Sequence, residues 1–418
     1  MPSALLDRLR AREYVLPDYN GRGLLAVPAT VLSHFGAHDA SDPAPLADLR
    51  PELLAGVKVV VVLLADGLGE GQLDRLRAEG HVPFLASVMD RADRGQSAQL
   101  LRVTTIFPST TAAAITTLNT ARTPQEHGNI AYFLWLEEFA QVTQMLRWGP
   151  GISRRGSYFD DATVDPVAYR RVRSIHGRLR ERGVPTFVVE PELFRKEAMT
   201  KMHAAEATYV GYILPTTLEV RVRDLLRARP WGDGPAYVYA YWSGIDTAAH
   251  QYGPNSPEHD AEASALDNAL GRALAGRAPG DVLVLLTADH GHAAIDPDRL
   301  IDLEADLELR ALLRNPIAGE PRVAFLHTDE PDLVKAHLSR TYGDAFFLFD
   351  RDEAIASGLF GRGEPDAVRR RVGEVCAMLG DDRAASIVRI DGAVVHHYGA
   401  HGGLTAAEMN IPILAWRA

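Results

Sequence analysis

The stretch "VKVVVVLLADGLG" at residues 57–69 decides the fold of this chain. It is a continuous apolar run that ends in an aspartate and two glycines. Such runs are typical of strands buried on both faces in the parallel sheets of α/β proteins. Three similar runs lie at 183–190, 235–246 and 281–291, and helical patterns separate them at 70–90, 111–121, 168–182, 216–228 and 258–277. Alternating strands and helices predict an α/β protein with a doubly wound, mostly parallel central sheet.

The residues from about 305 to 390 have a different pattern. "RVAFLH" (322–327) and "DAFFLFD" (344–350) are short and strand-like, whereas 331–341 and 365–379 are charged and helical. We expect a small α+β cap or insertion at 305–390, beside a core made of residues 1–304 plus 391–418. The first 50 residues are irregular in pattern, so they predict no element.

Composition excludes several classes of protein. The chain has 418 residues, 46% of them hydrophobic, which is typical of a globular protein with a large core. A net charge of -11 argues against a nucleic-acid scaffold, but a metal ion can still attract a nucleotide-sized substrate. Cys376 is the only cysteine, which excludes an intrachain disulfide. Without a signal-peptide pattern or an 18-residue apolar run, we expect a cytoplasmic protein with no membrane contact; the oligomeric state is not predicted.

Acidic side chains stand where three of the four apolar runs end, at Asp66, Asp246 and Asp289. Ligands of doubly wound sheets bind outside the carboxyl ends of the strands. "DTAAH" places Asp246 and His250 one helical turn apart, so both can reach one metal ion. Taken singly, such residues more often cap helices or form solvated pairs.

Two further motifs add imidazole groups to these carboxylates. "ADHGH" places Asp289 and His290 side by side after a strand, and "HGG" places His401 in a glycine-flanked loop that allows close approach of a ligand. Together with Asp66, Asp246, His250 and one hydroxyl, these residues supply enough oxygen and nitrogen donors for two divalent cations.

The stretch "PSTTAAAITTLNTARTPQEHG" (108–128) supplies the hydroxyl groups. Ser109, Thr110 and Thr111 are typical of a helix N-terminus, where hydroxyls cap the first turn. The same position attracts anions, because backbone N–H groups and the helix dipole point there. One of these hydroxyls is therefore either a cap or a nucleophile, and this stretch alone does not decide between them.

The motifs "LADGLG", "STTAAAITTLNTARTPQEHG", "GIDTAAHQYGP", "TADHGH" and "HGGLTAAEMNIP" together resemble the alkaline phosphatase superfamily. The resemblance is closest to its type I phosphodiesterase / nucleotide pyrophosphatase branch. It spans residues 57–418 and is weak in 133–230 and in the expected cap. It implies two divalent metal ions; zinc suits the donors, and manganese or iron accepts the same ones.

The resemblance also implies roles for single residues. One metal site is expected to consist of Asp246, His250 and His401, and the other of Asp66, Asp289, His290 and a nucleophilic hydroxyl that forms a covalent phospho-enzyme. Ungapped counting from the "P-x-x-H-G" element (Pro124, His127, Gly128) places this nucleophile at Thr111. Thr110 is the runner-up, and Ser109 and Thr110 are then expected to help cap the helix.

The phosphate contacts of the family are less well matched. An asparagine that binds a phosphate oxygen in the eukaryote-type branch corresponds by ungapped counting to Tyr132, whereas Asn129 lies closer to the H-G pair. Both are candidates for substrate binding. Arg102 and Arg122 are candidates for a phosphate clamp, although a surface position is the more ordinary one for each.

The resemblance implies a two-metal phosphoryl-transfer hydrolase of phosphodiesterase or nucleotide pyrophosphatase type, acting on a small phosphorylated substrate such as a nucleotide. The alternatives within the superfamily are a phosphonate or phosphomonoester hydrolase, or a phosphomutase. A non-catalytic metal-binding α/β module is a further alternative. A sulfatase is disfavoured, because Cys376 is not part of a C/S-x-P-x-R motif.

Overall fold

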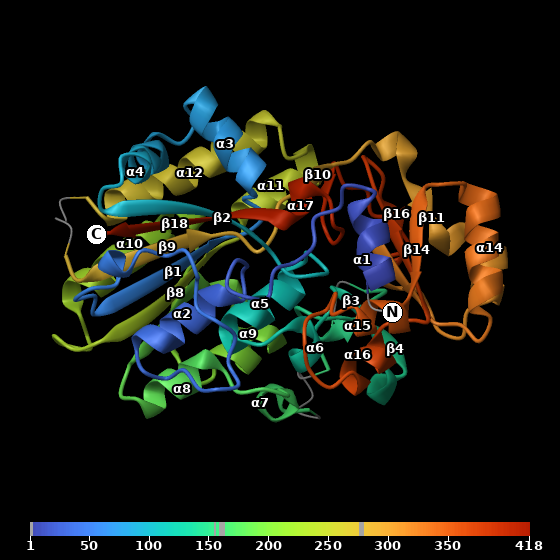
Figure 1. Cartoon of the computed structure of the whole chain (residues 1–418), viewed down its shortest axis with the longest axis horizontal. Helices are drawn as coiled ribbons and strands as arrows, with labels where there is room; N and C mark the ends of the chain where they lie inside the picture. The colour runs from blue at the N-terminus through green and yellow to red at the C-terminus, as the bar shows by residue number, and fades with distance from the viewer. Residues whose placement is uncertain (1–2, 154–155, 159–163, 276–279) are drawn as a thin grey trace.

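The computed structural model describes residues 3–153, 156–158, 164–275 and 280–418. Its centre is a seven-stranded sheet (Figure 1). In spatial order the strands are β2 (Ala98–Thr104), β18 (Asn410–Arg417), β9 (Val282–Thr287), β1 (Val59–Ala65), β8 (Ala236–Trp242), β6 (Thr186–Pro191) and β7 (Thr208–Tyr212). β18 runs against both of its neighbours, while the other pairs are parallel. The expected α/β fold with a mostly parallel sheet is confirmed.

The four apolar runs form the adjacent strands β9, β1, β8 and β6. Every side chain of β1, β8 and β9 is buried, because helices cover both faces of the sheet. One face carries α3 (Glu70–Glu79), α4 (Pro83–Asp93), α10 (Leu218–Ala228) and α12 (Pro257–Ala273). The other carries α2 (Ala26–His34), α5 (Thr111–Thr120), α8 (Ile175–Glu181) and α9 (Ala198–Ala204).

Several helices differ from the sequence patterns. The 70–90 pattern forms two helices, because Gly80 ends α3 with a φ of 81° and Pro83 begins α4. The 168–182 pattern contains α8 preceded by the short α7 (Pro166–Tyr169). For the helix expected at 258–277, positions 276–277 lie outside the described residues. The first 50 residues were wrongly expected to be irregular, since they form α1 (Ser3–Arg10) and α2.

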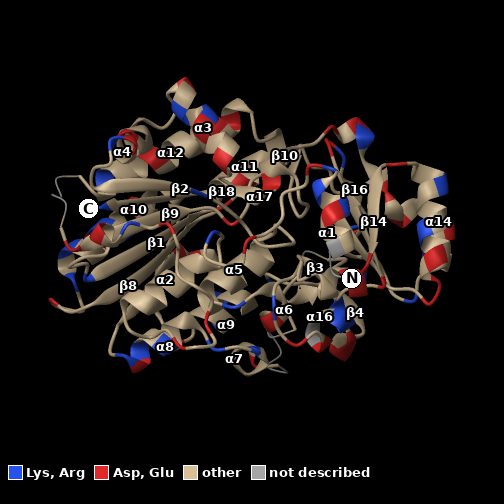
Figure 2. Cartoon of the chain, in the orientation of Figure 1, with Lys and Arg blue, Asp and Glu red and all other residues tan. Residues whose placement is uncertain are grey.

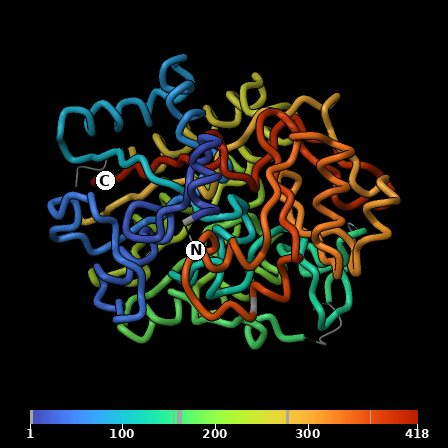
Figure 3. Tube along the Cα trace, turned by 45° about the vertical axis from the view of Figure 1, so that its right-hand side comes forward, coloured from blue at the N-terminus to red at the C-terminus, as the bar shows by residue number. Residues whose placement is uncertain are grey.

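A second seven-stranded sheet lies beside the first and is antiparallel. Its order is β14 (Phe346–Asp350), β15 (Val375–Leu379), β13 (Val323–Leu326), β12 (Ala318–Glu320), β3 (Phe133–Leu136), β4 (Gln141–Gln144) and β5 (Gly149–Pro150). Four strands come from the expected cap, but β3–β5 come from a stretch that the expected division left in the core. Gly319 of β12 pairs with Phe133 of β3 at the junction. In Figure 3 the teal trace of the β3–β5 stretch accordingly lies beside the orange trace of the expected cap. The expected boundaries of an independent cap, at residues 305 and 390, remain a prediction.

The stretch 365–379 was expected to be one helix, which is wrong. Only α16 (Asp366–Arg371) is helical, and Val375–Leu379 form β15 between β14 and β13. All five side chains of β15 are buried. A short run that is apolar on every side suits a central strand better than a helix, which would need a polar face toward solvent.

The second sheet has its own hydrophobic core, to which the N-terminal helix contributes. Leu5 and Leu9 of α1 are buried among residues of the second sheet, and Arg8 pairs with Glu353. Three helices lie beside this sheet: α14 (Pro331–Tyr342), α15 (Arg351–Ala356) and α16 (Figure 1). Lysine, arginine, aspartate and glutamate residues lie mainly on the outer helices and loops (Figure 2). Within the described residues, no helix is both long and apolar enough to cross a bilayer.

Candidate active site

Three carboxylates meet at one edge of the central sheet. Asp66 directly follows β1, Asp289 follows β9 by two residues, and Asp246 lies in the first turn of α11 (Gly244–Tyr252), just after β8. These three strands are parallel neighbours, so their carboxyl ends coincide. The structure therefore brings together the acidic side chains that the sequence patterns singled out.

The first cluster contains Asp66, Asp289, His290 and the Thr111 hydroxyl. The Nε2 atom of His290 lies 3.6 Å from Asp66 Oδ1, 3.4 Å from Asp289 Oδ2 and 3.1 Å from Thr111 Oγ1. These two carboxylate oxygens are buried without a hydrogen-bond partner among the described residues. Burial, with the charges of Asp289 and Asp246, raises the pKa of Asp66 well above its ordinary value. Such a site lacks positive charge.

The second cluster is centred on Asp246. Three imidazole Nε2 atoms approach its Oδ1 atom, from His292 at 3.0 Å, His250 at 3.3 Å and His401 at 3.7 Å. Although burial raises the pKa of Asp246, the neighbouring His250 and His292 outweigh it and hold that pKa well below the ordinary value. His292 was not among the predicted residues; the second histidine of "ADHGH" was the signal for it.

The Nδ1 atoms show which way each ring presents its lone pair. His250 Nδ1 lies 2.7 Å from the Gly399 carbonyl oxygen, His401 Nδ1 lies 2.9 Å from that of Ser109, and His290 Nδ1 lies 3.1 Å from that of Gly291. A carbonyl only accepts, so these rings carry their proton on Nδ1 and turn the Nε2 lone pair inward, as metal-ligating histidines do.

His292 behaves differently from these three histidines. Its Nδ1 atom is buried without a partner in the described part of the chain, while its Nε2 atom faces the Asp246 carboxylate. A carboxylate accepts, so His292 donates its Nε2–H to Asp246 and orients this acid. Gly67 makes room for the ring, since a Cβ atom there would come within 2.8 Å of His292 Nε2.

These donors fit two divalent cations. Buried carboxylate oxygens and inward-facing imidazole lone pairs converge in two adjacent clusters. These negative charges and lone pairs repel one another unless cations lie among them. The donors are nitrogen and oxygen without thiolate, which suits zinc, manganese and iron. Another group, Glu79, His81 and Asp260, is partly exposed and lies outside the sheet edge.

The helix that begins at Thr111 places this hydroxyl at the first cluster. Thr110 is the N-cap of α5, yet no side chain caps the helix, so the expected capping by Ser109 and Thr110 is wrong. The Ser109 hydroxyl instead donates to the Gly403 carbonyl at 2.8 Å and accepts from Gly402 N–H at 3.1 Å. It thereby holds the loop of His401, and the N–H groups of the first turn of α5 stay available for an anion.

A cavity of about 530 Å³ opens onto the two clusters. Thr111 and Tyr132 line it, together with Asp246, His250 and His401. Asn129 is not brought to this cavity, because its side chain donates to Thr116 Oγ1 at 3.0 Å beneath α5. Several residues that were not predicted also line it, among them His397 and Glu320. The pair of histidines in "HHYGAHGG" was a signal for His397, but no motif marks Glu320.

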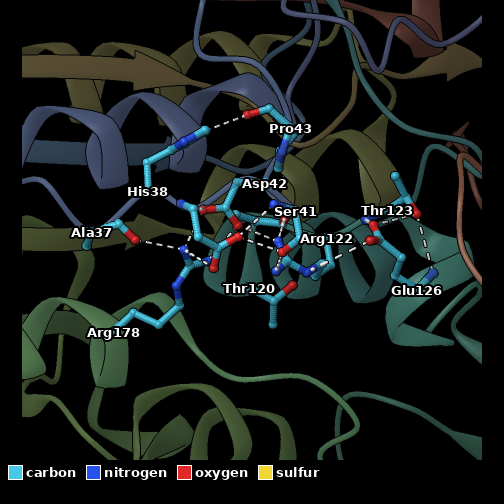
Figure 4. A network of polar contacts seen from close by, with 12 residues as sticks. Ala37, His38, Ser41, Asp42, Pro43, Thr120, Arg122, Thr123, Glu126 and Arg178 are labelled. Atoms are coloured by element: carbon cyan, nitrogen blue, oxygen red, sulfur yellow. Dashed lines mark hydrogen bonds and ion pairs between the residues drawn. The ribbon is translucent and has the colours of Figure 1, made fainter.

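The two arginines considered as candidates for a phosphate clamp are engaged elsewhere. Arg102 pairs with Glu70 and Asp74 and is 47% exposed. Arg122 donates to Asp42 at 2.6 Å, and Arg178 binds the same buried carboxylate (Figure 4). This network joins the segment after α2 to the end of α5 and to α8, so it is structural.

The mostly parallel sheet, with carboxylate and imidazole clusters at its carboxyl edge, is the architecture of the alkaline phosphatase superfamily. Within it, residues 60–403 match the family model of type I phosphodiesterase / nucleotide pyrophosphatase. The chain belongs to this family, whose members are metal-dependent hydrolases of phosphate esters. No curated protein matches the chain significantly.

Solved structures share the fold at low sequence identity. Murine ectonucleotide pyrophosphatase / phosphodiesterase 5, an inactive variant in complex with AMP, is 19% identical with a TM-score of 0.60, over 86% of this chain and 88% of that one. Phosphonoacetate hydrolase from Sinorhizobium meliloti 1021, in complex with phosphonoformate, is 17% identical with a TM-score of 0.60, over 86% and 90%. Human ectonucleotide pyrophosphatase / phosphodiesterase 5 is 14% identical with a TM-score of 0.59, over 85% of this chain and 87% of that one.

Proposed function

We propose that this chain is a two-metal phosphodiesterase or nucleotide pyrophosphatase whose nucleophile is Thr111. The observation that carries the proposal is the position of Thr111 Oγ1, at the N-terminus of a ten-residue helix and 3.1 Å from His290 Nε2. The murine relative is described as inactive with a threonine replaced by alanine, which supports a threonine nucleophile.

The residues that would hold the metal ions are those of the two clusters. Asp66, Thr111, Asp289 and His290 would bind one ion, and Asp246, His250 and His401 the other. Zinc is the ion we propose, with manganese and iron as substitutes on the same donors. When bound, the ions supply positive charge to the attacking and leaving oxygens of a phosphoryl transfer.

The Thr111 hydroxyl and the backbone of α5 supply the remaining chemistry. The Thr111 hydroxyl gives its proton to solvent and its Oγ1 atom attacks phosphorus, so that a bond from phosphorus to Thr111 forms. The bond to the leaving alkoxide or phosphate breaks, and the leaving oxygen takes up a proton from solvent. The free N–H groups at the start of α5 donate to the phosphoryl oxygens. Water then attacks the phosphothreonine from the side vacated by the leaving group, which releases the product and restores the Thr111 hydroxyl.

The substrate we propose is a small phosphorylated molecule such as a nucleotide. The murine relative binds AMP, which supports this class. Phosphonate hydrolysis is the second candidate, because the phosphonoacetate hydrolase shares the fold with the same TM-score. A phosphomonoesterase or phosphomutase would use the same nucleophile. These reactions are distinguished by which substrate the enzyme turns over.

The test compares the zinc-loaded wild type, Thr111→Ala and the neighbouring control Thr110→Ala. The substrates are bis-p-nitrophenyl phosphate, thymidine 5′-p-nitrophenyl phosphate, p-nitrophenyl phosphate and phosphonoacetate. We expect the two diesters to be the best substrates and Thr111→Ala to lower kcat by roughly 10³-fold or more. Acid-quenched wild type should yield a phosphopeptide containing residue 111. Wild-type turnover by Thr111→Ala would refute the covalent mechanism, and a dead Thr110→Ala would move the nucleophile by one residue.

A further inference from the structure

Glu320 is a carboxylate that the second sheet brings into the active-site cavity. It is the last residue of β12 and lines the cavity together with Thr110 and Thr111. Its stem packs against the loop of His401, where a Cβ atom on Gly402 would lie 2.7 Å from Glu320 Cβ. Gly402 has a φ of 118°, so both the backbone and the space there require glycine. The loop is thus shaped to admit this side chain.

No lysine or arginine of the described residues pairs with Glu320, and the charge of His250 lowers the pKa of this carboxyl less than burial raises it. Its Oε1 atom accepts the Tyr132 N–H at 2.5 Å, and the Thr110 hydroxyl lies beside it without hydrogen-bonding geometry. The nearest arginine in sequence, Arg322, pairs with the buried Glu408 instead. No ion pair of Glu320 occurs among residues 3–153, 156–158, 164–275 and 280–418. Burial raises the pKa of this carboxyl to about 7.

The rest of the wall above the clusters is largely apolar. Phe133, Leu146, Ile387, Val388 and Ile390 line it, and Arg147 uses its guanidinium to bind Gln144 Oε1 at 2.7 Å and the Ser153 carbonyl at 2.8 Å. A buried carboxylate among apolar side chains is costly unless a partner neutralises it. The group that best complements such a wall is an ammonium on a short alkyl stem.

We propose that Glu320 is a specificity-determining residue that binds an ammonium group on an alcohol esterified to the substrate phosphorus. The preferred substrates are then phosphodiesters of amino alcohols, and esters with a carboxylate at that position are rejected by like-charge repulsion. This inference rests on the proposed phosphodiesterase function and names its substrate class.

The test uses three diesters that share p-nitrophenolate as leaving group: p-nitrophenyl 2-aminoethyl, p-nitrophenyl ethyl and p-nitrophenyl carboxymethyl phosphate. We expect kcat/KM of the wild type to fall in this order, by roughly 100-fold overall. Glu320→Gln keeps the acceptor for Tyr132 N–H but loses the charge. It should reduce the ratio of kcat/KM between the best and the worst of the three diesters to less than roughly fivefold. The matched control is Glu190→Gln, a buried glutamate on a neighbouring cavity of about 310 Å³, which should keep the wild-type range.

A binding experiment separates this inference from the proposed function. Zinc-loaded Thr111→Ala is titrated with phosphoethanolamine and with phosphoglycolate, which differ in ammonium against carboxylate and need no turnover. Tighter binding of phosphoethanolamine, lost in Thr111→Ala/Glu320→Gln, supports the inference even if none of the three diesters is hydrolysed. Equal binding of the two ligands refutes it, as does an unchanged preference in Glu320→Gln. Loss of the preference in Glu190→Gln alone would place the discriminating carboxylate in the neighbouring cavity.

Discussion

Replacing His292 by alanine tests the proposal that His292 orients Asp246 and is not itself a metal ligand. The proposed ligands of that ion are Asp246, His250 and His401. The substitution removes the Nε2–H bond of 3.0 Å to the Asp246 carboxylate. A hydrogen bond to a charged group contributes about 1.5–3 kcal/mol. Loss of a residue that orients a metal ligand lowers metal affinity by roughly 10- to 100-fold, which is the same energy range. We therefore expect zinc affinity to fall by this factor at the Asp246 site alone.

The measurement is competition for zinc between the protein and a chelator of known affinity, which resolves the two sites as separate binding steps. The affinity of the site that contains Asp66, Asp289 and His290 should not change, because His292 faces only Asp246 among these acids. His81→Ala is the matched control, since His81 also lies near two carboxylates but on the surface, with 39% of its side chain exposed.

His292→Gln distinguishes donation from ligation. Glutamine offers an N–H donor at a similar reach but is a poor zinc ligand, so it should restore most of the affinity if His292 acts through Asp246. Complete loss of one zinc in His292→Ala, with no recovery in His292→Gln, would show that His292 is itself a ligand. Unchanged affinity in His292→Ala would show that Asp246 needs no orienting donor.

Three further predictions concern stability and the shape of the site. Burial raises the pKa of Glu190 to about 7 from an ordinary 4.5, so the free-energy cost of this carboxyl to the folded state grows as pH rises from about 4.5 to 7. Glu190→Gln should therefore raise the free energy of unfolding, measured by urea denaturation, by up to about 3 kcal/mol at pH 8 and by little at pH 4. Asp42→Ala removes the buried partner of Arg178 and leaves it only the exposed Asp39, so it should lower that free energy by about 3–5 kcal/mol. Asp48→Ala, on the surface, should change it by less than about 1 kcal/mol. Gly402→Ala should lower kcat/KM by displacing Glu320 or the His401 loop, while Gly392→Ala, with a φ of 81° and open space around it, should not.

The central sheet could be predicted because its strands carry their own signal. A strand buried on both faces must be apolar throughout, as in Val59–Ala65, and the acid that ends it marks the carboxyl edge. The meeting of Asp66, Asp246 and Asp289 then follows from chain direction alone. His250 could be predicted for a similar reason, since one helical turn separates it from Asp246 on α11.

The second sheet could not be predicted from local pattern. The strand Ala318–Glu320 is only three residues long, and it gains stability by pairing with Phe133 and with Val323–Leu326 rather than from its own composition. The same limitation applies to Ser109, whose hydroxyl suits a helix cap but binds the loop of Gly402 and Gly403. Tertiary partners that lie far away in sequence decide such cases.

The loop at His401 explains why long-range pairing matters for function. Ser109 holds it from the side of α5, and Glu320 packs on it from the second sheet. The proposed metal ligands, in contrast, lie at the edge of the central sheet, on α5 and α11, and in this loop. On these proposals, we expect metal affinity to depend on the central sheet and substrate choice on the second sheet, which meet at Gly402. Substitutions on β12 should consequently change which ester is hydrolysed while leaving zinc affinity close to that of the wild type.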